Sequence, residues 1–253
     1  RAGDRRSSRR RLALTAFLVP LVCWTFVYAH LWPIASMNDT AWILRNPTGA
    51  GAQHPITYTL TIGGLFRLGR LVGGDLAGVV LLSVGQMLLW ATCVSAVTVF
   101  LDRKGTSRRM TGVFIAYCAL MPLVADYSFA VVKDAAFSLF ATLLIPVLLV
   151  VRSSAGKVLL SRRGTVVVVA VLVGFALIRN NALPVVLVVL ALVVWWSRVH
   201  LRRAVTVSAV ALVLIVIPPA TTAQASHAEE ALGIPLQMVG YTLVHDAQCL
   251  PLA

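Results

Sequence analysis

The apolar residues of this chain fall into long blocks, which alternate with short polar and basic stretches. Seven blocks can be delimited, at residues 12–35, 76–101, 110–125, 135–151, 165–178, 182–196 and 204–220. They contain little of the strict apolar–polar alternation that indicates half-buried strands. Apolar blocks of this kind are typical of helices that cross a lipid bilayer. The pattern therefore predicts an all-α fold, a polytopic transmembrane helical bundle of about seven spans.

The composition also indicates that most of this chain lies in a lipid bilayer. Its 253 residues are 59% hydrophobic and only 12% charged, whereas soluble domains carry about 25% charged residues. The formal net charge of +13 would indicate nucleic-acid binding in a soluble protein. Here the basic residues lie in short runs between apolar blocks, where membrane topology explains them. We therefore expect no nucleic-acid partner.

The segment 56–72, inside the mixed region 36–75, decides the topology. If it lies along the outer interface as an amphipathic surface helix, 17 of the 22 Lys and Arg residues fall on the cytoplasmic side. These are in the stretches 1–11, 102–109, 152–164 and 197–203. If it spans the bilayer instead, eleven basic residues move outside. Because basic residues favour the cytoplasmic side, the surface helix is the better interpretation.

This topology divides the chain into three parts of a multi-pass plasma-membrane protein. Residues 1–11 form a basic cytoplasmic N-terminus, residues 12–220 the transmembrane domain, and residues 221–253 an extracytoplasmic C-terminal segment. The first residue is Arg, and the chain stops soon after its last apolar block. We therefore expect the sequence to be a truncated, N-terminal portion of a longer protein.

Acidic residues gather on the predicted outer face. Seven of the nine lie there: Asp39, Asp75, Asp126, Asp134, Glu229, Glu230 and Asp246. Acidic residues contribute little to topology, so their position is a hint about function. Among them, Asp39 follows the first span and precedes His54-Pro55. Its carboxylate could act as a general base on a hydroxyl substrate, or it could simply cap a helix.

A second group of candidates surrounds two short apolar blocks. Blocks 165–178 and 182–196 would form helices of only about 21 Å, against about 30 Å of hydrocarbon. The turn between them, Arg179-Asn180-Asn181, should therefore lie below the outer membrane surface. A cation at that depth requires water, a partner or a ligand. The planar guanidinium of Arg179 suits phosphate oxygens, which makes this turn a candidate binding cavity.

The loop before the fourth apolar block supplies further candidates. Lys133 could pair with Asp126, or it could bind a phosphate while Asp134 caps the helix that follows. Gln86, inside the second block, is better explained as a hydrogen-bonding contact between helices than as a ligand contact. The four cysteines form no CxxC motif, so no zinc site is predicted, and the sequence leaves open whether a divalent metal assists.

The order of these features resembles the GT-C superfamily of multi-pass glycosyltransferases, which take sugars from polyprenyl-phosphate donors. It is similar to their dolichyl-phosphate-mannose-mannosyltransferase-like bacterial branches over residues 12–240. The resemblance implies that Asp39 is the catalytic acid of the first loop, and that His54 lies in the family's His-Pro segment. It further implies that Lys133 and Arg179, with the adjacent Asn180, face the lipid phosphate. No organic cofactor is implied.

Two departures from the superfamily pattern stand out. Many members carry paired acids in the first loop, where this chain has Asn38-Asp39, and members are usually longer. The expected function is a membrane glycosyltransferase whose partners are a polyprenyl-phosphate-linked sugar and membrane lipid. The alternatives are a multi-pass transporter or lipid flippase, and a non-catalytic membrane assembly subunit. The oligomeric state is open.

The topology can be tested with single-cysteine variants in a background that lacks the native cysteines. We expect the Ser226→Cys variant to react with an impermeant maleimide in intact cells. The Ser107→Cys variant should react only after the membrane is opened. The physical basis is the distribution of basic residues across the two faces. Labelling of intact cells at position 107 but not at position 226 would overturn the topology.

Overall fold

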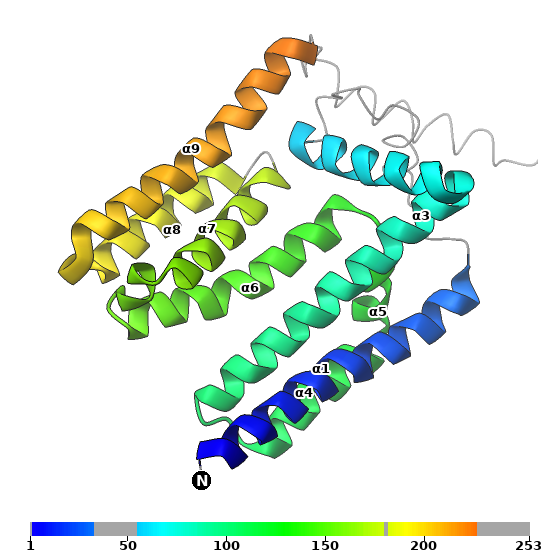
Figure 1. Ribbon diagram of the computed structural model, residues 1–253, viewed down its shortest axis with the longest axis horizontal. Coiled ribbons are helices and arrows are strands. Elements are labelled where there is room, and N and C mark those ends of the chain that lie inside the picture. Colours follow the sequence, from blue (N-terminus) through cyan, green and yellow to red (C-terminus); the bar gives the residue numbers. More distant parts are fainter. Residues whose placement is uncertain (1, 33–54, 180–181, 227–253) are drawn as a thin grey trace, which may run out of the picture.

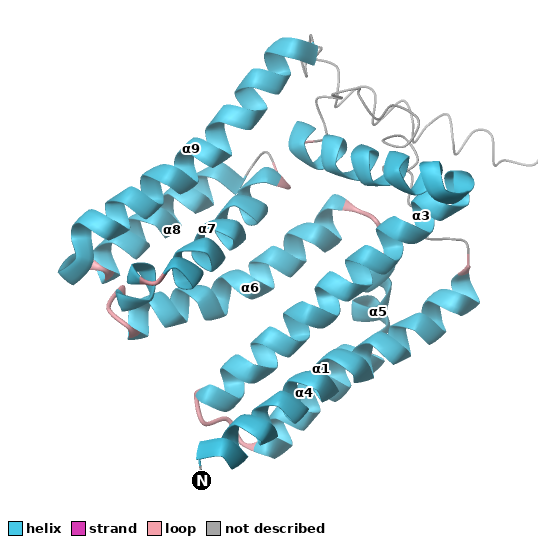
Figure 2. Cartoon of the chain, in the orientation of Figure 1, coloured by secondary structure: helices cyan, strands magenta, loops and turns pink. Residues whose placement is uncertain are grey.

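The computed structural model describes residues 2–32, 55–179 and 182–226. Within these ranges 91% of the residues are helical and no strand occurs (Figure 2), so the all-α prediction is confirmed. The α-helices of this part of the chain are α1 (Ala2–Leu31), α3 (Ile56–Arg103), α4 (Arg108–Leu120), α5 (Pro122–Phe129), α6 (Lys133–Ser153), α7 (Arg162–Leu177), α8 (Leu183–Trp196) and α9 (Leu201–Ser226). Two short 3₁₀ helices, η1 (Lys157–Leu160) and η3 (Arg198–His200), lie in the connections.

The helices are those of a membrane protein, but they do not establish seven spans. Four segments are long and apolar enough to cross a bilayer: Ser7–Leu31, Tyr58–Arg103, Lys133–Ser153 and Arg198–Ile217. The bent pair α4–α5 would make a fifth. The predicted spans 165–178 and 182–196 correspond to α7 and α8, which have 16 and 14 residues. At about 1.5 Å per residue they reach only about 24 and 21 Å.

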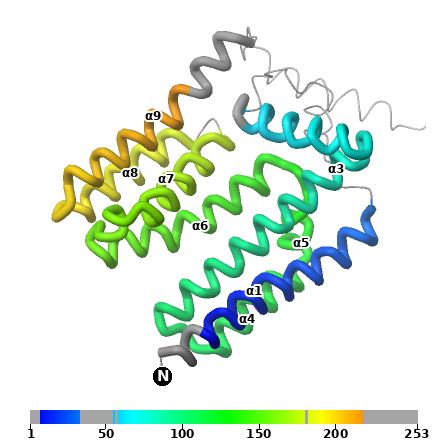
Figure 3. The backbone as a smooth tube through the Cα atoms, viewed as in Figure 1, coloured from blue at the N-terminus to red at the C-terminus, as the bar shows by residue number. Residues whose placement is uncertain are grey.

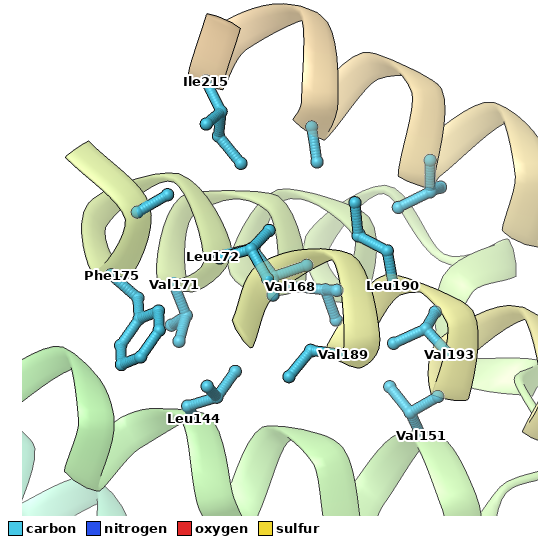
Figure 4. Packing of buried hydrophobic residues seen from close by; sticks show 14 of the residues in the cluster. Leu144, Val151, Val168, Val171, Leu172, Phe175, Val189, Leu190, Val193 and Ile215 are labelled. Carbon is cyan, nitrogen blue, oxygen red and sulfur yellow. The ribbon is translucent and has the colours of Figure 1, made fainter. Parts of the chain in front are cut away.

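The helices form two packed groups that lie side by side (Figure 1). The first group comprises α1, α4, α5 and most of α3, and its core includes Trp24, Met87 and Phe129. The second comprises α6 to α9, and its core includes Val168, Leu172 and Leu190 (Figure 4). Helix α3 contacts α6 and thereby joins the two groups. Apolar side chains from every helix of a group meet in its core, as helix packing requires.

The predicted boundary between the surface helix and the second span appears as a break inside α3. Gly73 and Gly74 depart from helical geometry, and Gly74 has φ 77° and ψ −165°. This region of backbone space is essentially restricted to glycine. The chain therefore turns sharply between a first limb, residues 56–72, and a second limb, residues 75–103 (Figure 3).

Small residues allow the two limbs of α3 to approach each other next to the break. A Cβ on Gly69 would lie 2.5 Å from the Cα of Gly78, and a Cβ on Gly78 would overlap the ring of Phe66. Across the turn, Arg70 Nε lies 2.7 Å from Asp75 Oδ1. Both partners of this ion pair are well exposed, so the close backbone contact contributes more to the turn than the charges do.

The predicted span 110–125 is not one straight helix. It is divided at Met121–Pro122 into α4 and α5, whose axes differ by 64°. Pro122 has no backbone N–H and cannot continue the hydrogen bonding of α4, and it disfavours a helical conformation at Met121. Met121 is extended, with φ −71° and ψ 117°. A helix can begin at Pro122, since its ring fits the first turn.

The basic stretches gather at one end of the bundle, which we call the basic end. Asp102 Oδ2 accepts a hydrogen bond from Arg9 Nε at 2.9 Å, and Arg108 Nη2 donates to Ser8 Oγ. These contacts join the start of α1 to the connection between α3 and α4. In the second group, Arg203 Nε donates to the carbonyl oxygen of Leu159. The opposite end, where α1 ends and α6 begins, is the distal end (Figure 1).

The break in α3 gives a stability prediction. Gly74→Ala should destabilise the fold by about 1–3 kcal/mol, because alanine is strained at this backbone conformation. Gly85→Ala is the matched control: Gly85 lies inside the same helix, with no atom within 4 Å of an added Cβ. It should be neutral or stabilising by about 0.5–1 kcal/mol. Thermal unfolding in detergent, followed by circular dichroism, compares them. Equal melting temperatures would refute the strained turn.

Candidate functional site

Three segments far apart in sequence meet at the distal end of the bundle. They are the first limb of α3, the connection from α5 to α6, and the end of α7. Their buried apolar side chains form one cluster together with Leu82 of the second limb of α3; the other members are Tyr58, Ile62, Phe66, Val131 and Ile178. Val131 lies two residues before Lys133, and Ile178 directly precedes Arg179. The first limb of α3 therefore packs against the backbone that carries both predicted cations.

Arg179 pairs with Asp134, one of the acidic residues on the predicted outer face. Arg179 Nη2 lies 2.7 Å from Asp134 Oδ1. The two side chains are 47% and 48% exposed, so the ion pair lies at the edge of the packed interior. The prediction that a cation at this turn needs a partner is met by a carboxylate from the neighbouring helix.

An aromatic ring fixes the guanidinium from a second direction. Arg179 Cζ lies 5.2 Å from the ring centroid of Phe137, within the range of a cation–π contact. Phe137 itself packs against Phe175 of α7, with 4.6 Å between the ring centroids. Asp134 and Phe137 lie three residues apart on α6 and therefore share one face of that helix. Helix α6 thus supplies both groups that orient Arg179.

The beginning of α6 adds further positive potential. Lys133 is its first residue and is half-buried. The N-cap is Val132, which forms no side-chain capping bond, so Asp134 is not the cap that the sequence predicted. It lies in the first turn instead. A carboxylate there interacts favourably with the helix dipole, and the same dipole attracts an external anion.

The two remaining candidates on α3 and α5 have clear structural positions. Asp126 lies in α5 and is partly exposed, and its backbone carbonyl accepts a hydrogen bond from Ala130. Gln86 Nε2 donates to the carbonyl oxygens of Tyr127 and Ala130. The prediction that Gln86 links helices is therefore confirmed. It satisfies carbonyl groups at the end of α5 that the helix itself leaves without donors.

Asp39, His54 and Asn180 lie outside the described residues, so the geometry of the site rests on Lys133, Asp134 and Arg179. Among the described residues, no group of three or more His, Cys, Asp or Glu side chains is arranged to hold a metal ion. Asp134 and Phe137 both contact Arg179 and form the Arg179 cluster with it, and Lys133 begins the helix that carries two of its members. An arginine has five N–H donors, so those that the carboxylate does not use are chemically suited to an anion.

The comparison with known proteins gives a family without an assigned activity. Residues 15–252 match a family of unknown function, DUF6020. The chain belongs to this family. No curated protein and no solved structure matches it.

A double-mutant cycle on Asp134→Asn and Arg179→Gln tests whether the pair is mainly structural in this DUF6020 member. Because both side chains are about half exposed, we expect a coupling energy of about 0.2–1 kcal/mol in unfolding. The same cycle on the exposed pair Arg70–Asp75 is the control. A coupling of several kcal/mol at Arg179–Asp134 alone would instead identify a buried structural salt bridge.

Proposed function

We propose that the chain is an integral membrane glycosyltransferase, or the N-terminal part of one. It transfers a sugar from a polyprenyl-phosphate donor to an acceptor on the extracytoplasmic face of the plasma membrane. The observation that supports this most strongly is the position of Arg179. Its guanidinium is held by Asp134 and Phe137 of α6, the helix that Lys133 begins, at the end of the bundle opposite the basic end.

The chemistry of a phosphate leaving group matches this cluster. Arg179 has five N–H donors, and Asp134 is paired with one nitrogen, Nη2. The remaining donors can bind phosphate oxygens. A cation aimed at the phosphate stabilises the negative charge that develops as the sugar–phosphate bond breaks. The low dielectric at the membrane boundary strengthens this attraction.

In the proposed reaction Asp39 removes the proton from the acceptor hydroxyl, and the acceptor oxygen attacks the anomeric carbon. The bond between that carbon and the phosphate oxygen breaks, and the polyprenyl phosphate leaves with the electron pair. His54 and Asn180 are proposed to contact the donor. These three assignments come from the sequence and its resemblance to the GT-C superfamily. Whether a divalent metal takes part is left to experiment.

The proposed orientation puts the basic end in the cytoplasm and the distal end outside. The gathering of the basic loops at one end of the bundle supports it, because that is the arrangement the positive-inside bias selects. The first limb of α3 then lies along the outer interface. The seven-span topology also belongs to this proposal, with α4 and α5 as one bent span and α7 and α8 as short ones.

Transport is a second candidate, favoured by the break between α4 and α5. Secondary transporters bind their substrates where helices are interrupted within the membrane. Here the axes of α4 and α5 differ by 64°, and Gln86 satisfies carbonyl groups at the end of α5. The same break is also explained by Pro122 alone. The Arg179 cluster is therefore the stronger observation, and it favours the transferase over transport.

The test is sugar transfer from a radiolabelled polyprenyl-phosphate sugar by membranes that contain the full-length protein. Arg179→Lys keeps the charge but loses the bidentate fork, so donor binding should weaken about tenfold or more. Arg67→Lys is the matched control, because Arg67 is exposed on the first limb of α3. Its donor binding should match wild type. Unchanged binding by Arg179→Lys would remove Arg179 from the site.

Asp39→Asn separates the catalytic role from binding in the same assay. It should bind the donor normally while turnover falls about 10²–10⁴-fold, the usual contribution of a general base. A helix-capping role predicts little change, since Asn caps as well as Asp. If the wild-type protein transfers no sugar but moves a lipid or solute across vesicles, transport replaces the transferase proposal.

A further inference from the structure

An apolar groove lies between α8 and α9 at the basic end of the bundle, away from the Arg179 cluster. It has a volume of about 710 Å³, within the range of about 300–1,000 Å³ that is typical of small-molecule sites. Its walls include Leu187, Ala191 and Trp195 of α8, and Leu201, Val205 and Ala209 of α9. The two helices run side by side here (Figure 1).

The shape of the groove follows from small residues on both helices. Ala191 and Ala209 leave space between the helix backbones, while Trp195 and Leu201 form larger walls toward the basic end. Trp195 is 63% exposed and Leu201 is 50% exposed. Large apolar side chains this accessible are solvated by acyl chains in a membrane protein. The groove therefore suits a hydrocarbon chain.

Arg198 gives the groove a charged mouth. It belongs to η3, between the two helices, and its Cζ lies 4.0 Å from the ring centroid of Trp195. The guanidinium is thus held at the groove by a residue that lines it. Within the described part of the chain Arg198 forms no ion pair, and Asp102 at the same end is paired with Arg9. Arg198 is therefore available to an anionic group.

A polar atom lies deeper in the groove. Ser208 lines it, and the hydroxyl oxygen of Ser208 is buried without a hydrogen-bond partner among the described residues. Ser208 is seven residues after Leu201, about 10 Å along α9. A buried hydroxyl without a partner is costly, so a rotation of the partly exposed Ser208 side chain toward a ligand acceptor in the groove would stabilise the site. An ester carbonyl below a headgroup phosphate is such an acceptor.

We propose that this groove binds an anionic phospholipid. One acyl chain lies between α8 and α9, the phosphate contacts Arg198, and an ester carbonyl accepts a hydrogen bond from Ser208. The basic side chains that surround this end, Arg152, Arg202 and Arg203 among them, favour a negatively charged headgroup over a zwitterionic one. This inference depends on the membrane character of the helices and not on glycosyl transfer.

The experiment is native mass spectrometry of the protein released from nanodiscs. The nanodiscs contain equal amounts of phosphatidylglycerol and phosphatidylcholine with identical acyl chains. Wild-type protein should retain phosphatidylglycerol preferentially. Arg198→Gln should reduce that preference about fivefold, the factor for one basic residue near an anionic surface. Arg163→Gln is the matched control: it removes an exposed charge from the same end but does not line the groove, so the preference should remain.

A second variant tests the groove itself. Ala191→Phe fills it from an exposed position, so the variant should fold and lose bound lipid of both kinds. Ser208→Ala should weaken retention of both lipids while leaving the preference between them. Equal retention of the two lipids by wild type would overturn the proposal. So would an equal effect of Arg163→Gln and Arg198→Gln, or a dimer that Ala191→Phe dissociates without any change in bound lipid.

Discussion

The turn at Gly73–Gly74 is the constraint on which the rest of the arrangement depends. A straight helix of the 48 residues of α3 would be about 72 Å long, more than twice the thickness of a bilayer core. The turn leaves a second limb of suitable length and folds the first limb back beside it. If the first limb crossed the membrane instead, every later connection would change sides. The close contact of Gly69 with Gly78 shows that the turn is built into the packing.

The same turn shapes the candidate site. It brings Tyr58, Ile62 and Phe66 against Val131 and Ile178, the residues next to Lys133 and Arg179. Arg179 thereby lies at the border between an apolar cluster and the exterior. A cation in that position needs compensation, and Asp134 and Phe137 on one face of α6 supply it. The ion pair and the aromatic contact hold the guanidinium in place before any ligand arrives, which lowers the entropy cost of binding.

Much of this architecture is predictable from the sequence. In a membrane protein the apolar blocks mark the helices, and the basic runs mark the connections between them. The boundary near residue 73, the short helices α7 and α8, and the role of Gln86 all follow from local patterns. The pairing of Arg179 with Asp134 does not, because it depends on how α6 and α7 pack. The bend between α4 and α5 departs from the predicted straight span for a different reason: Pro122 lies within an apolar block, but it ends the helix that precedes it. The groove between α8 and α9 likewise depends on the facing of Ala191 and Ala209, which periodicity alone does not fix.

Arg179 and Arg198 show how one residue type can serve two ends of a membrane protein differently. Each guanidinium lies over an aromatic ring, Phe137 in one case and Trp195 in the other. Arg179 also faces a carboxylate, so the phosphate proposed to bind there would meet a compensated cation and gain mainly from geometry. Arg198 forms no ion pair within the described residues, and further basic residues lie at the same end, so the proposed attraction of an anionic lipid there would be mainly electrostatic. At the basic end Asp102 is paired with Arg9, whereas at the distal end Asp134 is paired with Arg179. Arg179 and Arg198 therefore lie in different electrostatic surroundings within one bundle.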